Sequence, residues 1–408
     1  MKIDQRAGRA RRDAAPFPFA LSRGGYVIPV LAWLASSLPS PAWAQSPTAR
    51  DGAVGGQGIQ YGLVLDGAYS SRDLALGGRE KGLALGHTEG TIAGNIDDLF
   101  AGRATAALHS HEGSIELELE EAFIETRTLP AGLSLRAGRF LSQIGYLNEQ
   151  HPHADDFVDR PLPYRAFLGS HYFDDGARMN WVAPTPVYLR LGLEVFNGSK
   201  LVSSAQESPA VGAFALSAKT GADWGLEHSW QVGLSYLRNR VDPTGDEADD
   251  EHDHDHHDEG DDHGHGVQFN GRDLWIVDAV WKWAPNGNNR DRQLRLSTEY
   301  VRVNEPSRFA TDDNYHEGWY VSAVYRFAPQ WEAGIRHGEL KVQEPHGDHF
   351  HRGRLRETEA MIAWKRSHFS ALRLQWTRQR DLGGFPEAGN AVMLQYVMSL
   401  GGHGAHTY

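Results

Sequence analysis

Apolar and polar residues alternate with a period of two along most of the chain. In residues 274–283 the odd-numbered positions are all apolar, and the even-numbered positions include Asp278 and Lys282. In residues 392–400 the parity is reversed, and Gln395 stands among the polar positions. A period of two sustained over about ten residues is typical of β-strands, whose successive side chains point to opposite faces. The chain is therefore predicted to be all-β.

Two all-β architectures produce this pattern. A soluble sandwich or barrel turns its apolar parity toward a packed core, whereas a transmembrane barrel turns it outward to lipid and lines a wet lumen with the polar parity. The membrane barrel is favoured because the runs approach the roughly 9–11 residues that a tilted spanning strand needs, and because the polar parity is strongly charged. Aromatic residues also gather near strand ends, as interface girdles require: Trp275, Trp281, Trp283, Trp319, Tyr320, Tyr325 and Trp331.

Sixteen segments carry the strand pattern, so the expected fold is a transmembrane antiparallel β-barrel of about 16 strands. The segments are 59–69, 89–97, 99–109, 114–127, 132–140, 176–184, 187–197, 210–219, 228–239, 272–284, 292–303, 317–327, 331–342, 356–366, 370–380 and 390–400. Short connections alternate with long ones, which are 141–175, 198–209, 240–271, 304–316 and 343–355. Outer-membrane barrels have short periplasmic turns and long extracellular loops. The stretch 70–110 is glycine-rich and poorly marked, so fourteen or eighteen strands remain compatible with the pattern.

The first 44 residues have the layout of a secretory signal peptide. Six basic residues precede a mostly apolar stretch at 26–38, and Ala42-Trp43-Ala44 follows as a cleavage pattern. We expect 45–58 to form a periplasmic segment, 59–400 the barrel, and 401–408 a tail that contains two histidines. The expected location is the outer membrane of a Gram-negative cell, with outer-membrane lipid and the barrel assembly machinery as partners.

Composition excludes several classes of protein. The 408 residues include no cysteine, which excludes disulfide scaffolds, thiolate zinc fingers, iron–sulfur proteins and cysteine hydrolases. The net charge of −13 argues against nucleic acid as a partner. No serine-hydrolase elbow, zinc-protease helix or phosphate loop is present, so we expect no enzyme. A TonB-dependent receptor would need about 22 strands and a plug domain before the first strand, for which no room is expected.

The charge is concentrated in one stretch. Residues 246–265 hold eleven Asp or Glu, six His and no Lys or Arg, so the rest of the chain sums to only −2. Imidazole and carboxylate together suit Zn²⁺ or another divalent transition metal. We expect the protein itself to require no cofactor. The alternative is a solvated acidic loop without a ligand. The candidate metal ligands are His252, His254, His256, His257, His263 and His265, with His346, His349 and His351 on a second extracellular loop.

The overall pattern of signal peptide, about sixteen strands and a long third loop resembles the outer-membrane porins, especially the porin O/P-like channels. In such porins the third extracellular loop folds into the lumen and narrows the pore. The resemblance implies a constriction formed by residues of 141–175: Asn148, Gln150, His151, His153, Asp155, Asp156, Asp159, Arg160 and Arg165. A ring of charge at such a point sets ion selectivity, but the residues carry both signs. Basic positions that could extend an anion path (Arg295, Arg326, Arg336, Arg373) are opposed by Glu116, Glu118, Glu120 and Glu299.

The sequence therefore predicts a passive outer-membrane channel for small solutes or ions, with metal-capturing loops at its mouth and a possible homotrimeric state. The alternative is a surface metal-binding protein whose barrel serves only as an anchor. A soluble periplasmic zinc carrier is a third hypothesis.

Overall fold

The computed structural model describes residues 58–111, 114–201, 211–240, 271–306, 310–311, 313–346 and 349–401. The expected signal peptide, nearly all of the His/Asp-rich loop and the C-terminal tail after residue 401 lie outside the described residues. The predictions made for those segments stay predictions.

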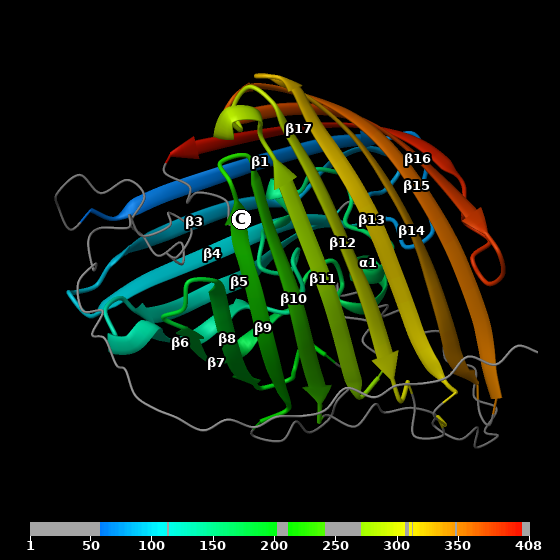
Figure 1. Ribbon diagram of the computed structural model, residues 1–408. Coiled ribbons are helices and arrows are strands. Elements are labelled where there is room, and N and C mark those ends of the chain that lie inside the picture. Colours follow the sequence, from blue (N-terminus) through cyan, green and yellow to red (C-terminus); the bar gives the residue numbers. More distant parts are fainter. Residues whose placement is uncertain are drawn as a thin grey trace, which may run out of the picture. The chain divides into compact units, whose positions relative to one another are not determined.

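Within the described residues, seventeen antiparallel strands form one sheet (Figure 1). They are β1 (Gln60–Ser70), β2 (Gly82–Leu85), β3 (Thr88–Asn95), β4 (Phe100–His111), β5 (Ser114–Thr126), β6 (Leu133–Leu141), β7 (Phe173–Val182), β8 (Tyr188–Phe196), β9 (Ala213–Trp224), β10 (His228–Asn239), β11 (Asp273–Trp283), β12 (Gln293–Asn304), β13 (Tyr315–Ala328), β14 (Trp331–His346), β15 (His349–Ser367), β16 (Ser370–Asp381) and β17 (Asn390–Gly401). Each strand pairs with its sequence neighbour, and β17 pairs back with β1 to close the barrel.

The barrel has sixteen strand positions because two of the strands share one. β2 and β3 are separated only by Gly86 and His87, and they pair with successive lengths of β1. The predicted all-β barrel of about sixteen strands is thus confirmed, and each of the sixteen predicted segments overlaps a strand. The strand missed by the sequence pattern is β2, which lies in the poorly marked stretch.

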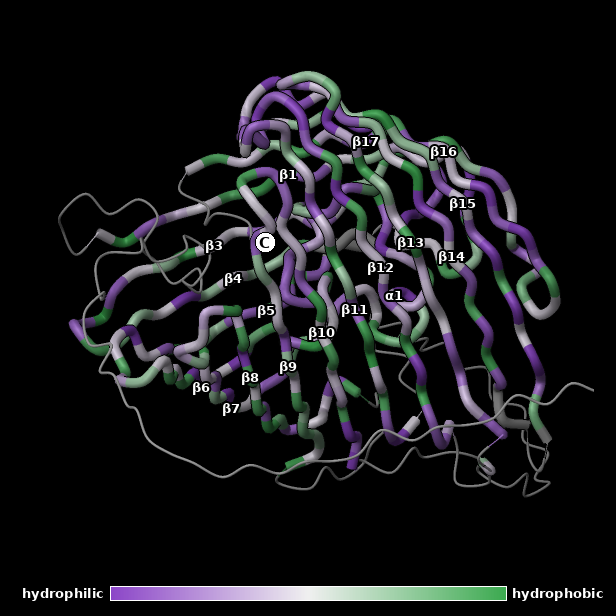
Figure 2. The backbone as a smooth tube through the Cα atoms, viewed as in Figure 1, coloured by the Kyte–Doolittle hydropathy of each residue, from purple (hydrophilic) through white to green (hydrophobic). Residues whose placement is uncertain are grey.

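Hydrophobic and hydrophilic residues alternate along the strands (Figure 2), and many large apolar side chains of the strands are exposed. On β16 and β17 the outward positions are large and exposed, such as Trp376 and Leu394, whereas the inward Gln375 and Gln395 are buried. A closed barrel with an apolar exterior leaves no unpaired strand edge in lipid, which is the condition for spanning a bilayer with strands. The prediction that Tyr320 belongs to the aromatic girdle was wrong, because its side chain points into the barrel and is buried there.

The connections alternate in length as expected, with two exceptions. The loop end of the barrel carries 71–81, 142–172, 197–212, 240–272, 305–314 and 382–389, and the opposite end carries the shorter turns. The predicted loop at 343–355 was wrong, because β14 and β15 continue to a hairpin tip at 347–348. The connection after β4 is also only two residues long. In the described residues, no helix is long and apolar enough to cross a membrane.

The inner surface is not polar throughout. Near the loop end, inward positions of several strands form one apolar cluster: Phe196, Ala215, Leu237, Leu274, Ile276, Val301, Val303, Leu340 and Leu355. The expectation of a uniformly wet lumen is therefore wrong in this zone. An apolar inner layer needs an apolar partner to exclude water from it, and the connection between β6 and β7 supplies that partner.

Candidate pore constriction and lumenal histidine cluster

Segment 142–172, which connects β6 to β7, turns into the barrel (Figure 1). Its helix α1 (Leu162–Phe167) is buried along its whole length. Pro161 precedes the helix and Pro163 lies in its first turn, where a missing N–H breaks no intrahelical bond. The helix packs into the apolar inner layer: Leu162, Tyr164, Ala166 and Phe167 belong to the same cluster as Ile276 and Val301. Burial of this face fixes the segment inside the lumen.

A single glutamate on β12 holds the beginning of the segment. The carboxylate of Glu299 accepts hydrogen bonds from the backbone N–H groups of Tyr146 at 2.9 Å and Leu147 at 3.3 Å, and from the Tyr164 hydroxyl at 2.9 Å. Gly145 allows this close approach. Its φ is +64°, and a Cβ there would lie 2.5 Å from both the Glu299 carboxylate and the Tyr164 oxygen. Only glycine fits this position without a shift of its neighbours.

Ion pairs fix the rest of the segment. Arg165 pairs with Glu357 of β15 and donates to the carbonyl oxygens of Arg160 and Leu76, each at 2.7 Å. Arg160 braces the segment internally, because its Nε lies 2.9 Å from an Asp155 carboxylate oxygen. Both guanidinium groups are thus engaged within the protein, which removes the reason to assign them to anion binding.

The basic positions once considered for an anion path are also engaged. Arg295 pairs with Asp156 of the segment, and Arg326 donates to Glu332 at 2.9 Å. Arg336 and Arg373 bind backbone oxygens of the segment, at Asp159 and Asp155 respectively. These residues lie on β12 to β16, and Glu149 reaches Arg190 and Lys219 of β8 and β9. We call the inner face of β8–β16 the docked wall.

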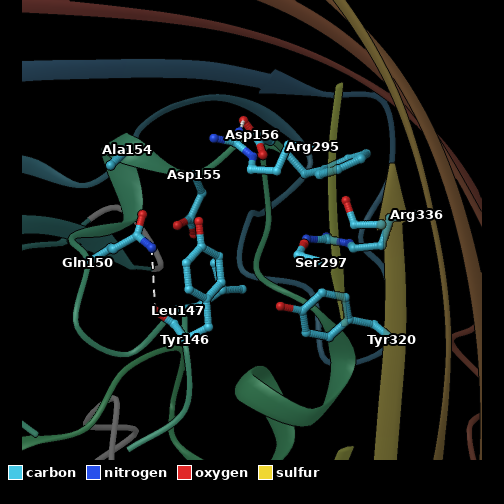
Figure 3. A pocket seen from close by; sticks show the side chains of 12 residues that line it. Tyr146, Leu147, Gln150, Ala154, Asp155, Asp156, Arg295, Ser297, Tyr320 and Arg336 are labelled. Atoms are coloured by element: carbon cyan, nitrogen blue, oxygen red, sulfur yellow. Dashed lines mark hydrogen bonds and ion pairs between the residues drawn. The ribbon is translucent and has the colours of Figure 1, made fainter. Parts of the chain in front are cut away.

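The contact between the segment and the docked wall is not completely filled. A cavity of about 30 Å³ lies between them, lined by residues that include Tyr146, Asp155, Asp156, Arg295, Tyr320 and Arg336 (Figure 3). At roughly 10–15 Å³ for each water position, it has room for about two water molecules.

The opposite side of the segment faces the inner surface of β3–β6, which we call the acidic wall. Six carboxylates line it against two guanidinium groups: Glu89, Glu116, Glu118, Glu120, Glu121 and Glu125 against Arg103 and Arg136. Two charged side chains of this wall are partly open to water, whereas Glu89, Glu120, Glu121 and Glu125 are buried. Arg103 and Glu118 are 29% and 26% exposed, whereas Arg165 and Glu357 on the docked side are each 3% exposed.

A β-bulge brings two consecutive acids to this wall. The β4–β5 register shifts between Thr105 and Ala106, so Glu121 faces Thr105 while Glu120 has no cross-strand partner of its own. A bulge inserts one residue and redirects its side chain. Both Glu120 and Glu121 are consequently buried on the lumenal side.

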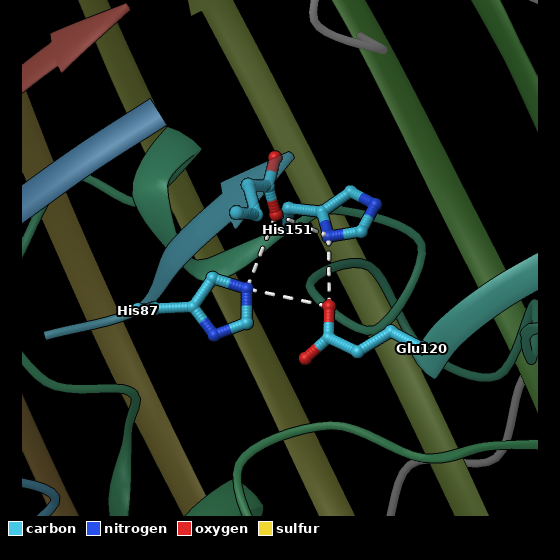
Figure 4. Close-up of side chains that lie close together, drawn as sticks. His87, Glu120 and His151 are labelled. Atoms are coloured by element: carbon cyan, nitrogen blue, oxygen red, sulfur yellow. Dashed lines mark hydrogen bonds and ion pairs between the residues drawn. The ribbon is translucent and has the colours of Figure 1, made fainter. Parts of the chain in front are cut away.

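Histidines from two segments meet the acids of this wall (Figure 4). The His87 Nε2 lies 3.1 Å from Glu89 and 3.3 Å from Glu120. The His151 Nδ1, which comes from segment 142–172, lies 3.0 Å and 3.4 Å from the same two carboxylate oxygens. We refer to His87, Glu89, Glu120 and His151 as the lumenal cluster. Its four nearest polar atoms all lie within 4.8 Å of one another.

Two of the segment's histidines have opposite electrostatic surroundings. Burial lowers the pKa of His151, but the carboxylates of Glu89, Glu120 and Glu121 more than offset this and raise the pKa well above its usual value. Burial dominates at His171, whose pKa is lowered although Glu120 lies beside it. The carboxylates of the acidic wall thus attract positive charge more strongly at His151 than at His171.

The structure brings the predicted constriction residues together in one lumenal segment but divides their roles. Arg165 and Asp156 pair with Glu357 and Arg295 of the docked wall. Arg160 and Asp155 pair with each other, and Asp159 lies 3.8 Å from Arg79 of connection 71–81. Asn148 holds backbone groups of Ser142 and Tyr172 within the same segment, and Gln150 lies in the cavity lining. His151 and His153 face the acidic wall, where His153 lies 3.1 Å from Glu89. The predicted charge ring is thus mostly a set of internal ion pairs.

The predicted metal-binding loops remain largely untested. His252, His254, His256, His257, His263 and His265 lie outside the described residues. The backbones of His346 and His349 pair across the β14–β15 hairpin, and His351 pairs with Glu344 in the same register. This hairpin and the 240–272 connection lie at the same end of the barrel.

Sequence reasoning named His151 and Glu120 but missed the other two members of the lumenal cluster. His87 and Glu89 belong to the glycine-rich, poorly marked stretch, and His171, which lies beside the cluster, follows the helix of segment 142–172. The available signals were the spacing His87-Thr-Glu89 and the adjacent pair Glu120-Glu121, which breaks the alternation of β5. A break of alternation within a strand indicates a bulge, and bulges often stand beside functional sites.

Comparison with known proteins supports the architecture. No family model matches the chain. A relative from Aquifex aeolicus (strain VF5), described as an uncharacterized protein, is 26% identical over 354 residues, which cover 81% of this chain and 71% of the relative.

Solved structures with similar folds are outer-membrane proteins. A loop-deletion form of OmpT from Vibrio cholerae matches with a TM-score of 0.54 and 9% identity, covering 84% of this chain and 99% of that one. An anion-selective porin from Comamonas acidovorans matches with a TM-score of 0.53 and 10% identity, covering 85% of this chain and 99% of that one. The DcaP channel of Acinetobacter baumannii matches with a TM-score of 0.51 and 12% identity, covering 84% of this chain and 96% of that one. Together with the closed barrel and its apolar exterior, these likenesses place the chain in the Gram-negative outer membrane as a sixteen-position β-barrel with the fold of porins.

Proposed function

We propose that the protein is a narrow outer-membrane channel whose aperture lies between segment 142–172 and the acidic wall. The observation that carries this proposal is the asymmetric placement of the segment. Buried ion pairs and hydrogen bonds hold it to the docked wall, while Arg103 and Glu118 of the acidic wall keep partial exposure. Water reaches the second side, so small solutes pass there.

The charge of the acidic wall gives the channel a preference for cations. Carboxylates outnumber guanidinium groups on β3–β6, whereas the charges of the docked wall are largely cancelled in pairs. Charge rings at a constriction set the sign of the permeant ion. Divalent metal ions are therefore suitable permeant species.

Planar-bilayer recordings of the refolded protein test this function. We expect discrete ohmic steps and a reversal potential that indicates cation preference in a potassium chloride gradient. A silent barrel would support the alternative hypothesis, in which the barrel only anchors metal-binding loops. Parallel recordings with chloride, phosphate and zinc salts would identify the preferred solute class.

We also propose that residues 246–265 and the β14–β15 hairpin capture divalent metal, with zinc as the best fit to their imidazole and carboxylate groups. In outer-membrane barrels the longer loops face outward, so captured metal would be concentrated at the outer mouth. Zinc flux into liposomes should fall when residues 246–265 are deleted, and equal flux would contradict this role.

A trimer is proposed as the assembled state. One of the similar solved structures is a trimer form of OmpT from Vibrio cholerae. Native mass spectrometry of the detergent-extracted protein measures the state directly.

A further inference from the structure

We infer that His87, Glu89, Glu120 and His151 form a binding site for one divalent transition-metal ion inside the barrel, where segment 142–172 meets the acidic wall. The site differs from the proposed metal-capturing loops, which belong to the loop end of the barrel. It joins three separate parts of the chain: the β2–β3 junction, the bulge of β5 and the inward segment.

Four of the six spacings among the ligand atoms fit a tetrahedral ion, and the other two are within 4.8 Å. Going around the cluster, nitrogen and oxygen alternate: His87 Nε2, Glu89 Oε2, His151 Nδ1 and Glu120 Oε2 are separated by 3.1, 3.0, 3.4 and 3.3 Å. Zinc binds nitrogen and carboxylate oxygen at about 2.0–2.2 Å, and a tetrahedron with such bonds has edges of about 3.3 Å. The side chains therefore need little movement to bind an ion.

One ligand atom already lacks an ordinary partner. The His151 Nδ1 is buried and lies within 3.4 Å of two carboxylate oxygens, yet it makes no hydrogen bond of acceptable geometry to either. Its other ring nitrogen, Nε2, is held 3.1 Å from Glu121. An imidazole fixed by a carboxylate at one nitrogen, with its second nitrogen aimed at further oxygens, has the arrangement found in metal sites.

An outer ring of contacts orients the other ligands. The second oxygen of Glu120 lies 2.9 Å from the His171 Nε2, and the second oxygen of Glu89 lies 3.1 Å from the His153 Nδ1. Glu121 is itself held by the Thr105 hydroxyl at 3.2 Å. Such outer partners fix the rotamers of ligands and are a regular component of protein metal sites. Three of the four ligands have one here.

The donor set selects the class of metal. Two carboxylates carry a charge of −2, which a divalent cation neutralises, and buried carboxylates without a compensating cation are costly. Imidazole nitrogen is a poor ligand for Mg²⁺ and Ca²⁺, which prefer oxygen, whereas Zn²⁺ and its first-row neighbours accept both. Zinc is therefore the appropriate probe. The competing interpretation is a cluster in which protonated histidines alone balance the acids.

Anomalous diffraction locates the ion directly. Crystals of the full-length protein grown with zinc chloride should show a zinc peak within about 2.0–2.2 Å of the four ligand atoms. Peaks that occur only outside the lumen would overturn the site. A zinc peak in a protein that passes no current would leave the site standing and contradict the proposed channel, so the two failures are distinguishable.

Chelator competition tests the same site in solution. We expect Glu120→Gln and, separately, His151→Gln to weaken one zinc site by at least roughly tenfold. Glu116→Gln is the matched control, because it removes the same charge from the same inward face of β5 outside the cluster. Heat-modifiable migration reports folding of each variant. Zinc isotherms that are identical for the folded Glu120→Gln or His151→Gln variant and the wild type would overturn the proposal.

Discussion

Segment 142–172 meets the barrel on two sides that use charge in opposite ways. On the docked wall, several acids and bases form buried pairs, such as Arg165–Glu357 and Arg336–Glu359. On the acidic wall, carboxylates are in excess and histidines stand among them. Matched buried charges give a fixed geometry but little net field, whereas an unmatched excess attracts cations. The first side positions the segment, and the second provides the chemistry of the proposed passage.

The largest expected effect comes from breaking the docked side. Arg165→Ala leaves Glu357 buried without its cation, which costs about 3–5 kcal/mol for a pair of this kind. We expect a lower thermal midpoint, measured by heat-modifiable migration, together with a higher single-channel conductance as the segment leaves the wall. Arg290→Ala, in an exposed turn at the opposite end, is the control. Unchanged conductance in a folded Arg165→Ala protein would show that the segment does not set the aperture.

Acid should weaken the docked side only at low pH. Glu149 is buried, which favours its neutral form, but Arg190 and Lys219 lower its pKa from 4.5 to about 2. A group whose pKa is depressed by folding stabilises the folded state above its unfolded pKa, and this contribution is lost as pH falls through the folded pKa. The difference between the unfolded and folded pKa of Glu149 corresponds to about 3 kcal/mol of folding free energy.

The thermal midpoint of Glu149→Gln, subtracted from that of the wild type at each pH, isolates this contribution from other titrating groups. We expect a constant difference above about pH 4.5 and a decline toward zero near pH 2. A difference that already disappears between pH 7 and pH 5 would contradict the assignment of the stabilising charge to Glu149.

The barrel could be predicted from the sequence because lipid imposes one rule on every strand. Each outward position must be apolar, so period two appears in the sequence regardless of what the lumen contains. Inward positions follow no such rule. Leu274 and Ile276 are apolar because α1 covers them, which made both parities of β11 apolar at one end. β2 was missed for another reason, because its four residues are too few to show a period of two.

The location of the constriction segment followed from a resemblance, but its contacts did not. Arg165 finds its partner 192 residues away, and Glu299 binds backbone groups about 150 residues before it. Pairings over such separations depend on strand order and register, neither of which is visible in a single sequence. The lumenal cluster depends additionally on a bulge that redirects Glu120. The histidine-rich composition indicated residues 246–265 as the metal site. The histidines of the lumenal cluster, His87 and His151, are instead far apart in the sequence, so composition does not reveal them.

The outer ring of the lumenal cluster gives a smaller effect than loss of docking. Glu121→Gln keeps all four proposed ligands but weakens the hydrogen bond that orients His151. Removing a partner of this kind typically weakens metal binding by about 10–100-fold. We expect a shift of that size in the zinc dissociation constant, measured by chelator competition, with the zinc position unchanged in anomalous maps. Equal affinities for the variant and the wild type would mean that Glu121 plays no positioning role.

The smallest expected effect tests the net charge of the acidic wall. The double variant Glu116→Gln/Glu118→Gln removes two lumenal charges outside the cluster. A unit charge at about 4 Å in water contributes about 1 kcal/mol, so the cation-to-anion permeability ratio should fall by up to about fivefold for each charge. Reversal potentials in a potassium chloride gradient measure the ratio.

The matched comparison is Asp156→Asn/Arg295→Gln, which removes an ion pair from the docked wall and leaves the net charge unchanged. If the excess of carboxylates on the acidic wall sets selectivity, this variant keeps the wild-type ratio while the acidic-wall variant loses much of it. Equal losses in the two variants would mean that ions pass on both sides of segment 142–172. A change confined to the docked-wall variant would place the passage on the opposite side from the one proposed.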